Sequence, residues 1–316
     1  SMIADVKNNI EELIWNYGSS NKIFNKKLSY YLLKDETKLC ALNGAAQIYP
    51  FINNKYCDAK VLMPSPTFGE YEKIFNNKEY YKDDGLFDFK KISNKIQNND
   101  IIVFVNPNNP TGTFTKSENI YDLIKKHPKK LFIIDESFID FSNSLSISEI
   151  SGSELLDNFL IIKSMSKSHG FPGVRIGYVY SNNLNLISDI KKSLPVWNFN
   201  SFAEYFLEIM LKYRNEFKVS IDKTVNDRND FIKNMKLQKW VNKVFDSSAD
   251  FILVETNKDV LGLIDSLLNE NSIYIRDISS KFKDKKTYFR FAVRTLSENN
   301  EMIEAINAYF NNSKKK

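Results

Sequence analysis

Between residues 60 and 180 the chain alternates short, uninterrupted apolar runs with longer polar stretches of helical pattern. The apolar runs are Lys60–Met63, Ile101–Val105, Leu131–Ile134, Phe159–Ile162 and Val174–Val179. Because these runs have the length of strands and show no polar face, they are typical of a largely parallel sheet covered by helices on both sides. The sequence therefore predicts an α/β domain, with ligands at the carboxyl ends of its strands.

The N-terminal segment is predicted to be a helix. Its apolar side chains have helical spacing, at Ile10, Leu13, Ile14 and Tyr17. A turn cluster over residues 16–20 ends it, and a second helix is predicted over residues 26–33. We expect the first helix to pack beside a small C-terminal domain.

The pattern changes after residue 198. An amphipathic helix begins near Ser201, and residues 288–294 alternate as in a strand, with Phe289 and Phe291 on one face. Ser297 is the predicted cap of the last helix. The predicted division is an N-terminal helix over 1–30 that packs with the small domain, a large domain over 31–198 and a small α+β domain over 199–316.

Composition excludes several classes of protein. The 316-residue chain has a net charge of only +5, and its lysines are scattered, which does not favour a nucleic-acid partner. No apolar run reaches 18 residues, so we expect no membrane span and a cytoplasmic protein. With two histidines and two cysteines, Cys40 and Cys57, at no metal-ligand spacing, the chain predicts no metal site.

Three polar motifs follow predicted strands. VNPNNPTG (105–112), taken alone, is most simply a turn, whereas the carboxylate of Asp135 in FIIDESF needs a cation or strong donor if it is buried. SMSKSHGFPGVRIGY (164–178) surrounds Lys167 with hydroxyls and places Arg175 eight residues later. The residues alone leave two functions open for this stretch: a phosphate-binding loop, or a nucleophilic lysine.

In this order and spacing the three motifs resemble the fold-type I pyridoxal-phosphate (PLP) enzymes, specifically the class I/II aminotransferases. The resemblance runs from about Tyr17 to the C-terminus and implies a three-layer large domain with a mostly parallel sheet. It further implies that Lys167 holds PLP as a Schiff base and that Asp135 pairs with the pyridine nitrogen. Asn109 would bind the ring hydroxyl, and the phosphate would be held by Ser164, Ser166 and Arg175.

The resemblance extends to residues outside these motifs. Gly44, Ala45 and Ala46 in LNGAAQ match a turn that meets the phosphate at a helix N-terminus. Phe68 matches a ring stacked on the cofactor, and Tyr17 matches a tyrosine donated to the partner subunit's phosphate, which implies a homodimer with shared active sites. The implied anchor of the substrate carboxylate is Arg290. Arg294, on the same strand face, has two open interpretations: a second anion or a surface carboxylate.

Two departures bear on the reaction. The resemblance is to the branch of histidinol-phosphate aminotransferases and threonine-phosphate decarboxylases, but Phe138 replaces the usual tyrosine, so Asn109 would serve the ring hydroxyl alone. The usual N-terminal arm is missing, which leaves two explanations: true absence, or a chain that is part of a longer fused polypeptide.

We expect an aminotransferase that moves an amino group between an amino donor and a small oxo-acid or aldehyde, with a phosphate or phosphonate end. The alternative is decarboxylation of a phosphorylated amino acid. A third reading, which intact Lys167 and Asp135 disfavour, is a non-catalytic binding protein on the same fold.

Overall fold

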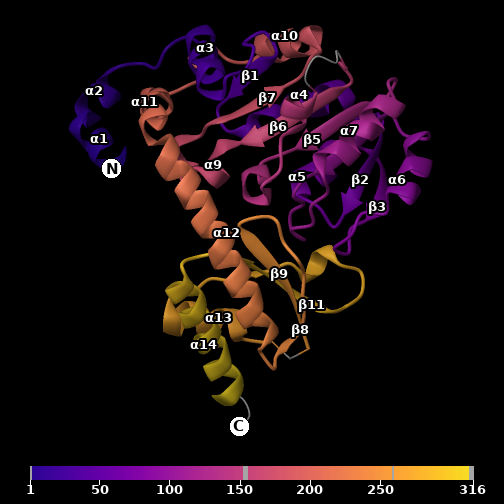
Figure 1. The fold of residues 1–316 in the computed structure, drawn as a ribbon, viewed down its shortest axis with the longest axis vertical. Coiled ribbons are helices and arrows are strands. Elements are labelled where there is room, and N and C mark those ends of the chain that lie inside the picture. Colours follow the sequence, from indigo (N-terminus) through magenta and orange to yellow (C-terminus); the bar gives the residue numbers. More distant parts are fainter. Residues whose placement is uncertain (1, 152–155, 258–259, 313–316) are drawn as a thin grey trace.

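The computed structural model describes residues 2–151, 156–257 and 260–312. Its larger sheet has seven strands in the order β1-β7-β6-β5-β4-β2-β3 (Figure 1). All are mutually parallel except β7, which runs antiparallel to both neighbours, β1 and β6. The strands are β1 (Leu39–Leu42), β2 (Lys60–Ser65), β3 (Asn77–Lys82), β4 (Ile101–Val105), β5 (Leu131–Asp135), β6 (Phe159–Ser164) and β7 (Gly177–Tyr180). The predicted α/β domain is thus confirmed.

Helices cover both faces of this sheet, since its central strands are buried on each side. Two separate apolar clusters lie above and below it, which gives the three-layer arrangement. One cluster includes side chains from α3 (Asn21–Leu32), α6 (Phe89–Ile96), α7 (Ser117–Lys126), α8 (Ile147–Ile150) and α11 (Ser201–Met210). The other includes side chains from α4 (Ile48–Tyr56), α5 (Gly69–Ile74) and α10 (Leu184–Ser193).

A second, antiparallel sheet of four strands lies at the other end of the molecule (Figure 1). Its order is β10-β11-β9-β8, and the predicted alternation holds, because Phe289 and Phe291 enter the small core while Arg290 faces away from it. The elements are α12 (Arg214–Lys236), β8 (Val241–Val244), β9 (Phe251–Thr256), α13 (Leu263–Asn271), β10 (Arg276–Asp277), β11 (Thr287–Ala292) and α14 (Leu296–Asn312). Within the described residues, no helix is long and apolar enough to cross a membrane.

The N-terminal segment forms two short helices, α1 (Met2–Asn8) and α2 (Ile10–Trp15). Both pack on α11, whose own buried side chains belong to the large domain's core. The segment therefore lies beside the larger sheet and away from the four-stranded one, which corrects the expected packing (Figure 1). Of its predicted apolar stripe only Leu13 is buried.

Three local predictions differ from the structure for identifiable reasons. The strand predicted over 174–179 begins only at Gly177, because residues 172–174 form a 3-10 turn and Arg175 has a φ of 66°. Strand β3 was not predicted, since it is an edge strand rich in polar side chains. The last helix is capped by Thr295, not Ser297: the Glu298 amide approaches the Thr295 hydroxyl at 3.4 Å, and the Glu298 carboxylate accepts from the Thr295 amide at 3.1 Å.

Candidate active site

A cavity of about 170 Å³ opens where β4, β5 and β6 end. Nine of the residues that the sequence nominated line it, drawn from five separate segments of the chain. They are Ala45, Ala46, Phe68, Asn109, Asp135, Ser164, Ser166, Lys167 and Arg175. The remaining lining residues include Tyr49, Ser137, Phe138 and Pro172. The position agrees with the rule that parallel sheets bind ligands at their carboxyl edge.

Asp135 is the last residue of β5 and is buried. Its carboxylate accepts hydrogen bonds from the Tyr71 hydroxyl at 2.9 Å and from the Ser137 amide at 3.0 Å. Burial raises the pKa of this carboxyl, and the donors together with the charge of Lys167 oppose that rise. A cationic N–H donor in the cavity would stabilise the ionised Asp135 carboxylate, and a protonated pyridine nitrogen is such a donor.

Another part of the cavity lining is suited to a phosphate. The Ser166 hydroxyl is buried and has no hydrogen-bond partner among the described residues. Ala45 and Ala46 begin the 3-10 turn η1 (Ala45–Gln47), which leads directly into α4, so their amides lie at a helix N-terminus. A phosphate oxygen would satisfy the Ser166 hydroxyl and these amides together.

Gly44, next to this part of the lining, is required by its surroundings. Its φ is 76°, and a Cβ there would lie 2.2 Å from a terminal nitrogen of Arg175. The Arg175 guanidinium therefore packs directly on the Gly44 backbone, while its other terminal nitrogen donates to the Pro172 carbonyl at 3.2 Å. The turn of residues 172–174 thus returns the arginine to the cavity that Ser166 also lines.

Lys167 lies on α9 (Met165–Ser168), and its Nζ is 5.9 Å from the centre of the Phe138 ring. Phe138 is buried and packs edge-on against Phe251, with ring centroids 5.1 Å apart. The phenylalanine thus supplies an apolar wall beside the lysine, where a tyrosine would have supplied a hydroxyl.

Arg290 of the small domain contacts Asn109, which lines the cavity. One terminal nitrogen donates to the Asn109 side-chain oxygen at 2.7 Å, and the guanidinium lies over the Phe251 ring at 5.1 Å. Burial lowers the pKa of Arg290, and the neighbouring charge of Arg276 lowers it further. Arg276 stands directly across from Arg290 in the β10–β11 register, and its side chain makes no hydrogen bond or ion pair with any residue that the structure describes.

Sequence reasoning missed Arg276, and a usable signal existed. The signal is that Arg276 follows Ile275 in a short segment that could pair with the predicted strand over 288–294. The segment is hard to recognise in the sequence because only two of its residues form a strand. Arg294, nominated instead, is 66% exposed and binds the Glu298 carboxylate through its terminal nitrogen at 2.7 Å. The surface-carboxylate interpretation of Arg294 is therefore the one that the contacts favour.

Tyr17 lies outside the cavity of its own chain. It is 83% exposed and contacts Trp197, with ring centroids 5.1 Å apart. Its donation to a partner subunit stays a prediction.

A buried polar network that the sequence did not predict supports Asn109. Asp83 follows β3 and accepts hydrogen bonds from the side chains of Asn108, Thr111 and Thr113. Asn108 also donates to the Pro66 carbonyl at 2.9 Å. The NNPTGT segment, which alone resembles an ordinary turn, is thus held from inside by one carboxylate.

His169, close to Lys167 in the chain, is held by packing and hydrogen bonds. Its Nδ1 lies 3.1 Å from the Met165 carbonyl oxygen, its Nε2 lies 3.0 Å from the Tyr31 hydroxyl, and its ring stacks on Phe217 at 4.2 Å. No group of three His, Cys, Asp or Glu side chains in the described ranges could hold a metal ion.

The comparisons with known proteins agree with this geometry. The family described as aminotransferase class I and II matches residues 11–306. The L-serine phosphate decarboxylase Cj1436c of Campylobacter jejuni is 30% identical over 312 residues, which is 92% of this chain and 78% of that protein.

Two solved structures are similar throughout. The histidinol-phosphate aminotransferase of Clostridium acetobutylicum has a TM-score of 0.85 at 30% identity, covering 96% of this chain and 94% of its own. A decarboxylase of Sulfurospirillum multivorans has a TM-score of 0.88 at 26% identity, covering 97% and 84%. The chain therefore belongs to the class I and II aminotransferase family, and its cofactor is pyridoxal phosphate.

Proposed function

We propose that this enzyme transfers an amino group between an amino donor and a small oxo-acid or aldehyde with a phosphate or phosphonate end. The observation that carries the substrate class is the pair of arginines, Arg276 and Arg290, facing each other across β10 and β11. Two adjacent guanidinium groups repel each other, and a ligand with two anionic ends relieves that repulsion. A phosphorylated amino acid has such ends.

The residues of the cavity have distinct tasks in this proposal. PLP, when bound, supplies an electron sink for the electron pair left at the substrate's Cα. Asp135 would keep the pyridine nitrogen protonated, and Ser166 and Arg175 would hold the phosphate. Lys167 would hold the cofactor, and its Nζ would move the proton that leaves Cα.

Amino transfer is the first candidate for the reaction because of the contact between Arg290 and Asn109. An arginine tied to Asn109 at 2.7 Å holds a carboxylate at the edge of the cavity where Asn109 serves the ring hydroxyl. A substrate carboxylate that is held by Arg290 is less readily released as CO₂. Such binding therefore favours removal of the Cα proton.

Decarboxylation is the second candidate, and the names of the relatives favour it. Two similar proteins are L-serine phosphate decarboxylases, from Campylobacter jejuni and Sulfurospirillum multivorans, and they match 92% and 97% of this chain. The same two arginines would suit that substrate, so the substrate class is common to both candidates.

One experiment separates the candidates. The PLP-loaded protein is mixed in turn with O-phospho-L-serine, O-phospho-L-threonine and 2-aminoethylphosphonate. Conversion of the cofactor to pyridoxamine phosphate without CO₂ release supports amino transfer, whereas CO₂ release supports decarboxylation. The Lys167→Ala variant is the control, and it should lose the visible absorbance of the lysine-bound cofactor. If PLP binds and none of the three compounds reacts, the proposed function is wrong, and a non-catalytic binding protein becomes the better interpretation.

A further inference from the structure

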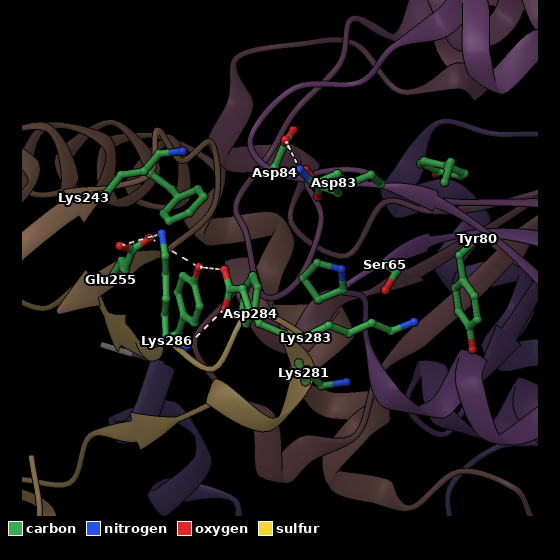
Figure 2. A pocket seen from close by; sticks show the side chains of 16 residues that line it. Ser65, Tyr80, Asp83, Asp84, Lys243, Glu255, Lys281, Lys283, Asp284 and Lys286 are labelled. Atoms are coloured by element: carbon green, nitrogen blue, oxygen red, sulfur yellow. Dashed lines mark hydrogen bonds and ion pairs between the residues drawn. The ribbon is translucent and has the colours of Figure 1, made fainter. Parts of the chain in front are cut away.

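A larger cavity of about 650 Å³ separates the two domains next to the active site. Figure 2 shows Ser65, Tyr80 and Asp83 on the large-domain side and Lys243, Glu255 and Asp284 on the small-domain side. Charges in its wall are largely paired within one domain, as in the ion pair of Lys286 with Glu255. Lys281 is different, because it connects the two sides.

Lys281 ends the 3-10 turn η5 (Ser279–Lys281) of the small domain. Its Nζ donates to the Thr67 carbonyl at 2.8 Å and lies 3.0 Å from the Glu72 carboxylate. Both acceptors belong to the large domain. The lysine side chain is 28% exposed, so this contact is partly shielded from solvent.

The acceptors flank residues of the active site. Thr67 directly precedes Phe68, which lines the cofactor cavity and is the residue before α5. Glu72 lies on α5 next to Tyr71, the donor to Asp135. A contact to both ends of this short segment therefore holds the Phe68 ring and the Tyr71 hydroxyl in one position.

On the small-domain side, Lys281 is close to the arginines. It follows Arg276 by five residues, and two hydrogen bonds fix the connection. The Ile278 amide donates to the Tyr288 carbonyl at 2.9 Å, and the Tyr288 amide donates to the Ser279 side-chain hydroxyl at 2.9 Å. Arg290 lies two residues beyond Tyr288 on β11. Movement of η5 would therefore move both arginines.

We infer that Lys281 is a positioning residue that sets the distance between the cofactor-binding segment around Phe68 and the anion-binding pair Arg276 and Arg290. It acts through the domain contact and touches neither cofactor nor substrate. The inference rests on the proposed function for its substrate part, whereas its cofactor part depends only on PLP.

The test compares Lys281→Met with Lys283→Met in the PLP-loaded protein. Lys283 lines the same cavity two residues later and has no hydrogen bond or ion pair with a described residue, so it is the matched control (Figure 2). Measured quantities are the PLP dissociation constant, the concentration of O-phospho-L-serine that half-saturates the change in cofactor absorbance, and the melting temperature.

We expect Lys281→Met to weaken both PLP and O-phospho-L-serine by about five-fold, as for loss of one charge-assisted contact. Lys283→Met should stay within about two-fold of wild type. Lys281→Arg should restore most of the loss, because it keeps the charge and a donor. A melting temperature near that of wild type would separate positioning from general destabilisation.

The inference is overturned if Lys281→Met and Lys283→Met give the same PLP and O-phospho-L-serine values. If Lys281→Met does not fold, Glu72→Gln replaces it. That change removes the ion pair but keeps the Thr67 contact. It should give about half of the loss in binding free energy that is expected for Lys281→Met. No effect of Glu72→Gln then counts against the inference. If wild type binds PLP but not O-phospho-L-serine, the proposed substrate class fails while the PLP comparison still decides the role of Lys281.

Discussion

At the scale of single residues, the cavity holds a polar group without a partner in the chain. The Ser166 hydroxyl is buried and has no hydrogen-bond partner among the described residues. A buried polar group of this kind costs stability, so it marks a place where a ligand is expected to bind. His169 nearby is the opposite case, with both ring nitrogens engaged.

Ser166→Ala should weaken PLP binding by roughly 10-fold, the effect of one lost hydrogen bond to a charged group. Because the hydroxyl has no other partner, the melting temperature of the PLP-free protein should not fall. Ser168→Ala is the matched control, since its hydroxyl contacts His169 instead. Fluorescence titration with PLP measures both variants, and equal dissociation constants would contradict the assignment of Ser166.

Burial lowers the pKa of His169 from 6.5 to about 4. The folded protein therefore keeps a neutral ring that the unfolded chain protonates below pH 6.5, so stability is full above 6.5 and falls as the pH drops towards 4. The shift corresponds to about 3 kcal/mol at the acid limit. His169→Gln should lose less stability than wild type between pH 7 and 4.5.

Urea unfolding at both pH values measures this difference. The control is His127→Gln: the His127 ring is only half-buried, and this change should leave most of the pH dependence in place. A pH dependence in His169→Gln as steep as that of wild type would exclude His169 as its source.

At the scale of elements, helix ends and turns decide where functional side chains point. Gly44 and the turn before Arg175 bring a glycine and a guanidinium together at the start of α4. In the small domain, the helix α14 that follows β11 has a similar local device. Its N-terminus is capped by Thr295, which exchanges hydrogen bonds with Glu298. Arg294 is drawn into this cap through its ion pair with Glu298.

Thr295→Ala should lower the free energy of unfolding by about 1 kcal/mol, the usual effect of losing an N-terminal cap. Ser297→Ala, which changes the residue that the sequence pattern favoured, should alter it by less than about 0.5 kcal/mol. Thermal unfolding of the two variants measures the difference. Equal losses would place the start of α14 elsewhere than the structure does.

At the scale of the whole molecule, apolar side chains gather on the surface around the N-terminal helices. Ile14, Trp15 and Tyr17 are 64%, 77% and 83% exposed, and Trp197, which contacts Tyr17, is 58% exposed. An exposed apolar patch of this kind is characteristic of an interface. We therefore propose that a second copy of the chain covers it, in a homodimer that shares its active sites through Tyr17.

Light scattering should give twice the monomer mass for the purified protein. Sharing is tested by mixing Lys167→Ala with Tyr17→Ala: if subunits exchange at random, about half of the Tyr17→Ala subunits acquire a partner with an intact Tyr17. Only these subunits should bind PLP tightly at limiting cofactor. Borohydride reduction and mass spectrometry of PLP on Lys167 measure that fraction. No gain over unmixed Tyr17→Ala would contradict sharing.

The sequence by itself determined the class of fold and predicted most of the residues that line the cavity. Uninterrupted apolar runs of strand length favour buried strands, and motifs that directly follow parallel strands meet at one edge of the sheet, as Asn109, Asp135 and Lys167 do. These conclusions needed only local periodicity and the direction of parallel strands.

What the tertiary structure decided depends on contacts between segments far apart in the chain. The pairing of Arg276 with Arg290 is set by strand register, and the bridge from Lys281 to Thr67 spans two domains. The tertiary structure also determined that α1 and α2 pack on α11 and not on the small domain. Register and domain packing depend on the sum of many weak contacts, so no short stretch of sequence carries them.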